Sequence, residues 1–116
     1  MKGKSSKTSN IIPQELMDKE IKIKESDLHP HIKARMLQRG ISIQEIEETL
    51  NKGWNATDAV EGTSGKVAVF TYNGEWEGKF FEEKEVTVYY KFKGEHFILL
   101  TAKARYGKDF KKGEKR

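Results

Sequence analysis

The stretch HPHIKARMLQRGIS, residues 29–42, decides the first half of the fold. Pro30 is suited to the first turn of a helix, and Gly40 is suited to the position just after a helix ends. Between them, Ile32 and Met36 form an apolar stripe at helical spacing. The stretch therefore predicts a helix that ends at Gly40.

A second helix follows directly. Ser42 and Glu45 have the spacing of a capping box, in which the cap hydroxyl and the carboxylate three residues later bond each other's free amides. Apolar residues then recur at steps of three and four, at Ile43, Ile46 and Leu50. Gly53 is suited to closing this helix.

After Gly53 the apolar period changes from near four to two, which is typical of strands. Four runs show it: GKVAVFTY (65–72), EWEGKFFEE (75–83), EVTVYYKF (85–92) and HFILLTAKARY (96–106). Asn73-Gly74 is the strongest short hairpin signal, and Lys93-Gly94 predicts a second tight turn. Residues 55–62, NATDAVEG, are expected to add a weak edge strand.

Helices followed by a meander of strands predict an α+β fold. We expect two or three N-terminal helices packed on one face of a four- to five-stranded antiparallel sheet. The expected organisation is a flexible segment over 1–27, with a short helix over 13–23 as an option, a domain over 28–110 and a basic tail over 111–116. The charged end of the chain is expected to be frayed.

Composition limits the function classes. The 116 residues are enough for about one domain, and 22 Lys and Arg against 18 Asp and Glu give a net charge of +4. This excess permits a polyanionic partner without requiring one. The absence of cysteine excludes disulfides and thiolate zinc sites, and three separated histidines make a poor metal signature. We expect no metal, no cofactor, no membrane association and a cytoplasmic location.

Strand alternation predicts a polar face on the last two strands. One face of the last run carries Phe97, Leu99, Thr101, Lys103 and Arg105, and the other carries Ile98, Leu100, Ala102 and Ala104. In the preceding run, Thr87, Tyr89 and Lys91 share a face opposite Val86, Val88, Tyr90 and Phe92. The polar face that these two runs form contains no carboxylate. This predicts a cationic surface, with a chance arrangement on an open face as the alternative.

The first helix carries a second polar row. His31, Arg35 and Arg39 step by four and stay on one broad side, next to the apolar stripe. This row could be a solvated face, or it could flank a cleft against the sheet. A purely structural alternative has Arg35 and Arg39 paired with glutamates of the second helix, at Glu45, Glu47 or Glu48.

If the helix row and the sheet face meet, they form a metal-free cationic site with an imidazole. Such a site suits RNA cleavage, because the 2′-hydroxyl of RNA can act as the nucleophile. A base removes its proton, cations stabilise the phosphoryl oxygens and an acid protonates the leaving 5′-oxygen.

The stretch HIKARMLQRGIS (31–42), followed by EIEETLNKG (45–53), resembles the H-x-x-x-R-M-x-x-R-G-I-S opening of a small, largely uncharacterised bacterial domain family. That family lies within the barnase–EndoU–colicin–RelE-like (BECR) ribonuclease group. Residues 99–107, LLTAKARYG, are similar to its closing strand. The resemblance covers roughly residues 28–110. A long hairpin over 72–85 and about 27 leading residues depart from compact members.

The resemblance implies a toxin-type endoribonuclease acting on tRNA, mRNA or rRNA, restrained by a cognate immunity protein or antitoxin. By position it implies catalytic roles for five residues: His31, Arg35, Thr101, Arg105 and Tyr106. Substrate-binding roles are expected for Arg39, Lys103, Lys91 and Tyr89. The alternative is a non-catalytic module that binds RNA or a protein through the same cationic face, with Trp54 and Trp76 as anchors if they are exposed.

Overall fold

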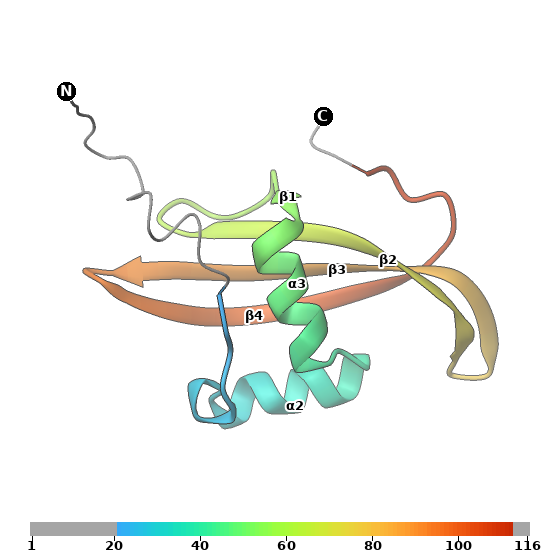
Figure 1. The fold of residues 1–116 in the computed structure, drawn as a ribbon, viewed down its shortest axis with the longest axis horizontal. Coiled ribbons are helices and arrows are strands. Elements are labelled where there is room, and N and C mark those ends of the chain that lie inside the picture. The colour runs from blue at the N-terminus through green and yellow to red at the C-terminus, as the bar shows by residue number, and fades with distance from the viewer. Residues whose placement is uncertain (1–20, 113–116) are drawn as a thin grey trace.

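The structure is a computed structural model that describes residues 21–112. It has an α+β fold, with two α-helices packed on a four-stranded antiparallel sheet of strand order β1-β2-β3-β4 (Figure 1). In chain order, the elements are η1 (Glu25–Asp27), α2 (Pro30–Arg39), α3 (Ile43–Lys52), β1 (Trp54–Asn55), β2 (Ser64–Trp76), β3 (Lys79–Lys93) and β4 (His96–Gly107). The predicted fold class is confirmed.

Both predicted helices form, and their end signals act as expected. Pro30 occupies the first turn of α2, and Gly40 follows its last residue in the left-handed conformation, at φ 71°. The capping box is present at the start of α3, where Ser42 and Glu45 bond each other's backbone amides. α3 lies across the sheet in contact with β2 and β3, whereas α2 lies along β4 (Figure 1).

The main hairpin turns at a different place from the one predicted. Trp76 pairs with Lys79, so Glu77 and Gly78 form the two-residue turn, both at positive φ. Asn73-Gly74 instead lies within β2, at a bulge where the register with β3 shifts. The run over 75–83 is therefore no separate strand. Such a bulge also places a residue at positive φ, which is why its sequence resembles that of a turn.

The second turn lies one residue after the predicted Lys93-Gly94 pair, because Lys93 pairs with His96 and leaves Gly94 and Glu95 as the turn. The expected edge strand over 55–62 is reduced to β1, which pairs only with Lys66 and Val67 of β2. A two-residue strand leaves the segment after it free to cross a face of the sheet.

A second bulge corrects the predicted faces of β4. Tyr89 pairs with Thr101 but Tyr90 pairs with Leu99, so Leu100 is the extra residue. Leu99 is consequently buried in the core and not beside Thr101. A single inserted residue reverses the alternation on one side of the bulge, and nothing in the local sequence signals it.

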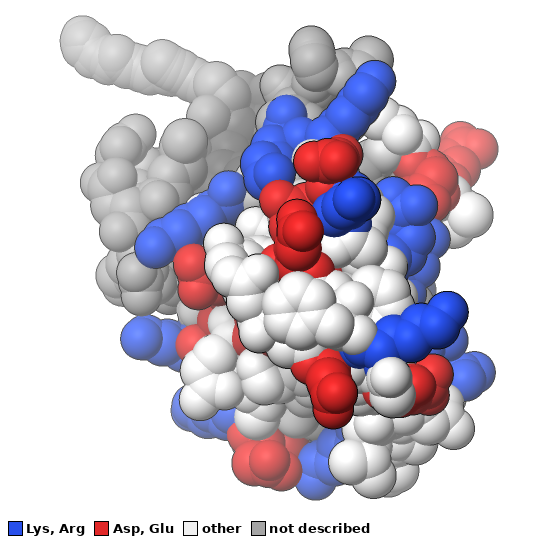
Figure 2. Space-filling model, turned by 90° about the vertical axis from the view of Figure 1, so that its right-hand side faces the viewer, with Lys and Arg blue, Asp and Glu red and all other residues white. Residues whose placement is uncertain are grey.

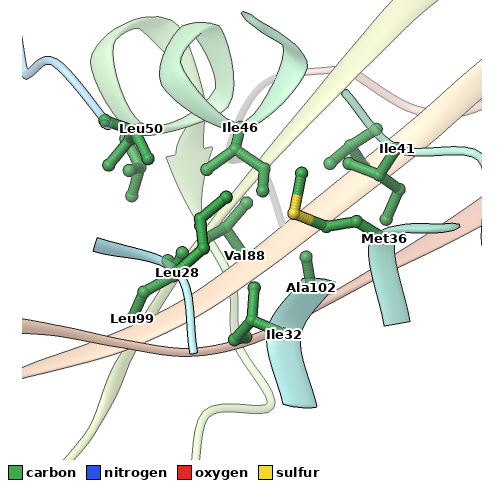
Figure 3. Close-up of a cluster of buried hydrophobic side chains, with 11 residues drawn as sticks. Leu28, Ile32, Met36, Ile41, Ile46, Leu50, Val88, Leu99 and Ala102 are labelled. Atoms are coloured by element: carbon green, nitrogen blue, oxygen red, sulfur yellow. The ribbon is translucent and has the colours of Figure 1, made fainter. Parts of the chain in front are cut away.

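The core lies between the helices and one face of the sheet, called here the helix face. Figure 3 shows the side chains that meet there: Leu28, Ile32, Met36, Ile41, Ile46, Leu50, Val88, Leu99 and Ala102. Ile46 and Val88 are fully buried. Each such side chain stabilises the fold by about 1.5–3 kcal/mol relative to exposure.

The predicted end segments lie partly within the described residues. The option of a helix over 13–23 falls largely outside the described residues, and residues 21–24 are not helical. The backbone amides of Ile21 and Ile23 donate to Asn51 and Glu47 of α3, so residues 21–23 are attached to the fold. At the other end, residues 108–112 are also attached and not frayed as expected, because Glu83 bonds both Phe110 and Lys112.

Candidate functional site

A pocket of about 420 Å³ lies on the sheet face opposite the helices, called here the open face. Its floor is formed by β2, β3 and β4, and one wall by β1 and the residues that follow it. The lining side chains with polar, charged or aromatic groups are Trp54, Asn55, Thr57, Asp58, Glu85, Thr87, Tyr89, Lys103 and Arg105.

Strand register explains why these residues meet. Trp54 pairs with Val67, Val67 with Thr87 and Thr87 with Lys103, so one row crosses all four strands. Directly paired residues in antiparallel strands project to the same face. Glu85 and Arg105 form part of the next row. The pocket is therefore a consequence of sheet register and not of one local motif.

Glu85 and Arg105 form an ion pair on the pocket floor. Nε of Arg105 donates to Oε1 of Glu85 at 2.9 Å. The Glu85 side chain is only 16% exposed, whereas that of Arg105 is 66% exposed. The bond to Glu85 raises the pKa of Arg105 further above its usual value. The pair uses Nε, so the two terminal nitrogens of the guanidinium keep donors for a ligand.

Asp58, Tyr89 and Lys103 form a second charged group beside it. The Tyr89 hydroxyl donates to Oδ1 of Asp58 at 2.8 Å, and Nζ of Lys103 lies 3.4 Å from Oδ2. The bond from Tyr89 lowers the pKa of Asp58. Burial, followed by the bond to Asp58, raises the pKa of Tyr89, and the contact with Tyr89 raises that of Lys103. At neutral pH the group therefore holds a carboxylate, a phenol and an ammonium.

The chain end restrains Arg105 from a second direction. The ring of Phe110 lies 4.9 Å from the guanidinium carbon of Arg105. Glu83 holds this segment by accepting bonds from the backbone amide of Phe110 at 2.9 Å and from Lys112 at 2.8 Å. The bond from Lys112, followed by the bond from the Phe110 amide, lowers the pKa of Glu83.

The prediction of a face without carboxylates is wrong. β3 begins at Lys79, so Glu85 lies within the strand and shares its face with Thr87 and Tyr89. Asp58 reaches the same face from the segment after β1. Two carboxylates thus balance two cations in the pocket. At the end of the sheet that carries the β2–β3 turn, charges of both signs are likewise mixed (Figure 2).

The helix row lies beside β4 but has no bond to the pocket. His31 is exposed, and the guanidinium of Arg35 bonds Gln38 of its own helix at 3.4 Å. Within residues 21–112, no hydrogen bond or ion pair therefore joins His31 or Arg35 to Thr101 or to the cations of the sheet face, Lys103 and Arg105.

Two other predicted site residues hold the fold together. Nη1 of Arg39 donates to the carbonyl oxygen of Ala102 at 2.7 Å, at the edge of β4. The Tyr106 hydroxyl donates to the carbonyl oxygen of Arg39 at 2.7 Å, and its ring stacks on Trp76. Tyr106 alternates with Arg105, so it lies on the helix face, away from the pocket. Glu45 pairs with Lys84 and not with either arginine.

The remaining predicted residues lie on the open face outside the pocket. Thr101 pairs with Tyr89, and Lys91 is exposed two pairs before the Lys93–His96 pair that closes the β3–β4 turn. The charged pocket residues that the sequence interpretation missed are Asp58 and Glu85. Thr87 was expected on this face without a site role, and Trp54 was expected as an anchor only in the binding-module alternative. Alternation with Tyr89 could have found Glu85, whereas Asp58 arrives by long-range packing that has no local signal.

The described residues contain no cluster of three or more His, Cys, Asp or Glu side chains able to hold a metal ion. Within the same part of the chain, no helix has the length and apolar character needed to span a bilayer.

A model of one protein family, described as a domain of unknown function (DUF4258), matches residues 28–103. The match begins just before α2 and ends within β4, and it includes the α2–α3 turn. No curated protein and no solved structure matches the chain.

Proposed function

Because this chain belongs to the family of domains of unknown function DUF4258, whose description assigns no activity, we propose from the chain's own site that it is an endoribonuclease that needs no metal. The observation that carries the proposal is the Glu85–Arg105 pair on the floor of a pocket, with Lys103 and Tyr89 alongside. The resemblance to the BECR ribonuclease group supports the same reaction class.

Glu85 is assigned the role of general base. It is a largely buried carboxylate whose orientation is fixed by Arg105. In the proposed step, Glu85 takes the proton of the 2′-hydroxyl as that oxygen attacks the adjacent phosphorus. The bond from phosphorus to the 5′-oxygen breaks, which leaves a 2′,3′-cyclic phosphate.

The cations have distinct roles in this reaction. The terminal nitrogens of Arg105 bind the phosphoryl oxygens, on which negative charge grows in the transition state. Lys103, protonated at neutral pH, gives a proton to the departing 5′-oxygen. Water then returns the proton from Glu85 to Lys103, so the site is restored without any other reactant. Tyr89 holds Asp58 and so keeps the ammonium group in place.

The proposal includes a partner. A toxin that cleaves the RNA of its own cell must be inhibited or exported by the cell that makes it. The toxin role implied by the resemblance therefore brings with it a cognate immunity protein or antitoxin that covers the pocket.

A non-catalytic binding module is the second candidate, and the charge balance of the pocket favours it. Both cations are already paired with carboxylates, which weakens their attraction for phosphate. The two functions differ in what Glu85 does. A binding module should bind RNA more tightly when Glu85→Gln removes a negative charge, and it should cleave nothing.

The test is cleavage of an end-labelled single-stranded RNA by the purified chain in EDTA. The proposal predicts products with 2′,3′-cyclic phosphate ends, and a loss of at least about 100-fold in rate for Glu85→Gln. Arg105→Lys should also be impaired, because lysine cannot make bidentate contacts. Glu82→Gln is the matched control, since Glu82 is an exposed carboxylate of the same strand. Absence of cleavage by folded wild-type protein would refute the proposed function.

A further inference from the structure

The wall of the pocket opposite Lys103 is aromatic. Trp54 and Lys103 stand at the two ends of the row that crosses the sheet through Val67 and Thr87. Three interstrand spacings separate their backbones, or about 14 Å. Thr87, which lies between them, is a small side chain that lines the pocket and is only 5% exposed. The row thus places an indole ring and an ammonium group on either side of a shallow space.

The lining residues separate into two chemical halves. The β4 side holds the two cations available to a phosphate, Lys103 and Arg105, which are paired with Asp58 and Glu85. The β1 side holds Trp54. The other aromatic ring that lines the pocket, Tyr89, already lies against Lys103, whose Nζ is 5.4 Å from the ring centre. Within residues 21–112 no ring or cation packs on Trp54, which is half-buried and lines the pocket. Of the two rings, Trp54 is therefore the one left for a planar ligand.

From this arrangement we infer that Trp54 is a base-stacking wall, and that the pocket takes one unpaired nucleotide of a single-stranded nucleic acid. This inference rests on the proposed function, which supplies nucleic acid as the ligand class. It adds that the site selects single strands. The pocket volume of about 420 Å³ falls within the range of roughly 300–1,000 Å³ that is usual for small-molecule sites.

Selection for single strands follows from the geometry of stacking. A base within a duplex has both faces against its neighbours, so an indole ring cannot reach it without unpairing that base. An unpaired base exposes a face and gains stacking energy on Trp54 while its phosphate lies toward Arg105. A duplex gains only the phosphate contacts.

The test is binding, measured by tryptophan fluorescence in a Trp76→Phe background. The chain has two tryptophans, so this variant leaves Trp54 as the reporter. Phenylalanine preserves the ring at a position that stacks on Tyr106. The probe is an oligodeoxynucleotide of about eight nucleotides, a length within usual single-strand site sizes, compared with a duplex of the same sequence at one salt concentration. DNA lacks the 2′-hydroxyl and is not cleaved.

The inference predicts quenching of Trp54 by the single strand and at least about ten-fold weaker binding of the duplex. Trp54→Ala should weaken single-strand binding by about ten-fold, and Trp54→Phe should retain most of it. Equal binding of both probes by the Trp76→Phe protein, or binding without quenching, would overturn the inference, even if Trp54→Ala fails to fold.

Cleavage of RNA by the wild-type chain is scored separately. Cleavage together with equal binding of the two probes would refute the stacking wall and leave the nuclease standing. Trp54-dependent binding without any cleavage would refute the nuclease and leave the single-strand site standing.

Discussion

Nζ of Lys84 lies 2.8 Å from Oε1 of Glu45, and the same ammonium donates to the carbonyl oxygen of Gly40. The Lys84 side chain is 3% exposed and that of Glu45 is 23% exposed. One buried cation therefore attaches β3 to the turn between α2 and α3. This contact, together with Tyr106 and Arg39, gives the R-G-I-S part of the opening motif a structural role in placing the helices on the sheet.

Replacing Lys84 with methionine should destabilise the domain by about 2–4 kcal/mol, because it leaves Glu45 and the Gly40 carbonyl without their partner. Urea unfolding followed by circular dichroism measures the change. The double variant Lys84→Met/Glu45→Gln should lose less stability than the sum of the two single variants. Strict additivity would mean that the two side chains do not interact.

Gly40 is expected to tolerate no side chain. Its φ is 71°, and an added Cβ would lie 2.5 Å from the Trp76 ring and 2.8 Å from the Tyr106 hydroxyl. Gly62 provides the matched control, since its φ is 86° and nothing lies within 4 Å of an added Cβ. Gly62→Ala should cost about 1–2 kcal/mol from its backbone conformation alone. Gly40→Ala should cost clearly more in the same unfolding experiment, and equal costs would show that the close contact is absent.

The stability of the domain should fall at alkaline pH through Tyr106. Burial raises the pKa of Tyr106 to about 12 from a usual value of 10.0. The folded state thus holds a proton that the unfolded state has lost, so the contribution is complete below pH 10 and disappears as the pH rises toward 12. Tyr106→Phe should remove this part of the pH dependence and cost about 1 kcal/mol at neutral pH by losing one hydrogen bond. Unfolding series from pH 8 to 11 for both proteins provide the check, and parallel curves would contradict the assignment.

Phe110 is expected to act as a positioning residue for Arg105. Phe110→Ala removes the ring beside the guanidinium and should lower the RNA cleavage rate several-fold at saturating RNA, with little change in unfolding free energy. Phe92→Ala is the control, because Phe92 is 58% exposed and far along β3 from this pair. A Phe110→Ala protein that cleaves as fast as the Phe92→Ala protein would remove Phe110 from the site.

Glu83 sets the lowest pH at which the segment around Phe110 stays attached to β3. Its pKa is lowered by Lys112 and by the amide of Phe110, so its bonds are complete above the usual pKa of 4.5 and are lost as the pH falls through the lower folded value. Hydrogen exchange of the Phe110 amide should therefore be slow relative to its intrinsic rate above pH 4.5 and lose its protection at lower pH. Glu83→Gln should remove most of this pH dependence, and a dependence retained in full would assign it to another group.

The helices and fold class could be predicted from the sequence, because the signals that set them are local. Pro30, Gly40 and the Ser42–Glu45 box act within a few residues of where they stand. The position of the main hairpin turn could not, since Asn73-Gly74 suits a bulge as well as a turn and the long pairing of β2 with β3 decides between them.

The candidate site was predictable in part on two strands, since alternation also placed Thr87 and Tyr89 of β3 on one face. Alternation along β4 correctly placed Lys103 and Arg105 on one face, because no bulge lies between Thr101 and Gly107. The pocket itself depends on Trp54 and Asp58, which reach the open face only once β1 has paired with β2. The separation of Tyr106 from Arg105 follows from the same alternation, although the closing-strand motif suggested a shared role.

Endoribonuclease activity of the pocket is best tested in cells, by running total RNA on a denaturing gel after induced expression in bacteria, with growth followed in parallel. Wild type, Glu85→Gln and His31→Ala are compared at equal soluble protein levels. If Glu85 is the base, growth arrest and discrete RNA fragments are expected for wild type and for His31→Ala, and normal growth with intact RNA is expected for Glu85→Gln. Intact RNA with soluble wild-type protein would contradict the nuclease itself. Fragments that persist in Glu85→Gln and vanish in His31→Ala would place the base on α2 and not in the pocket.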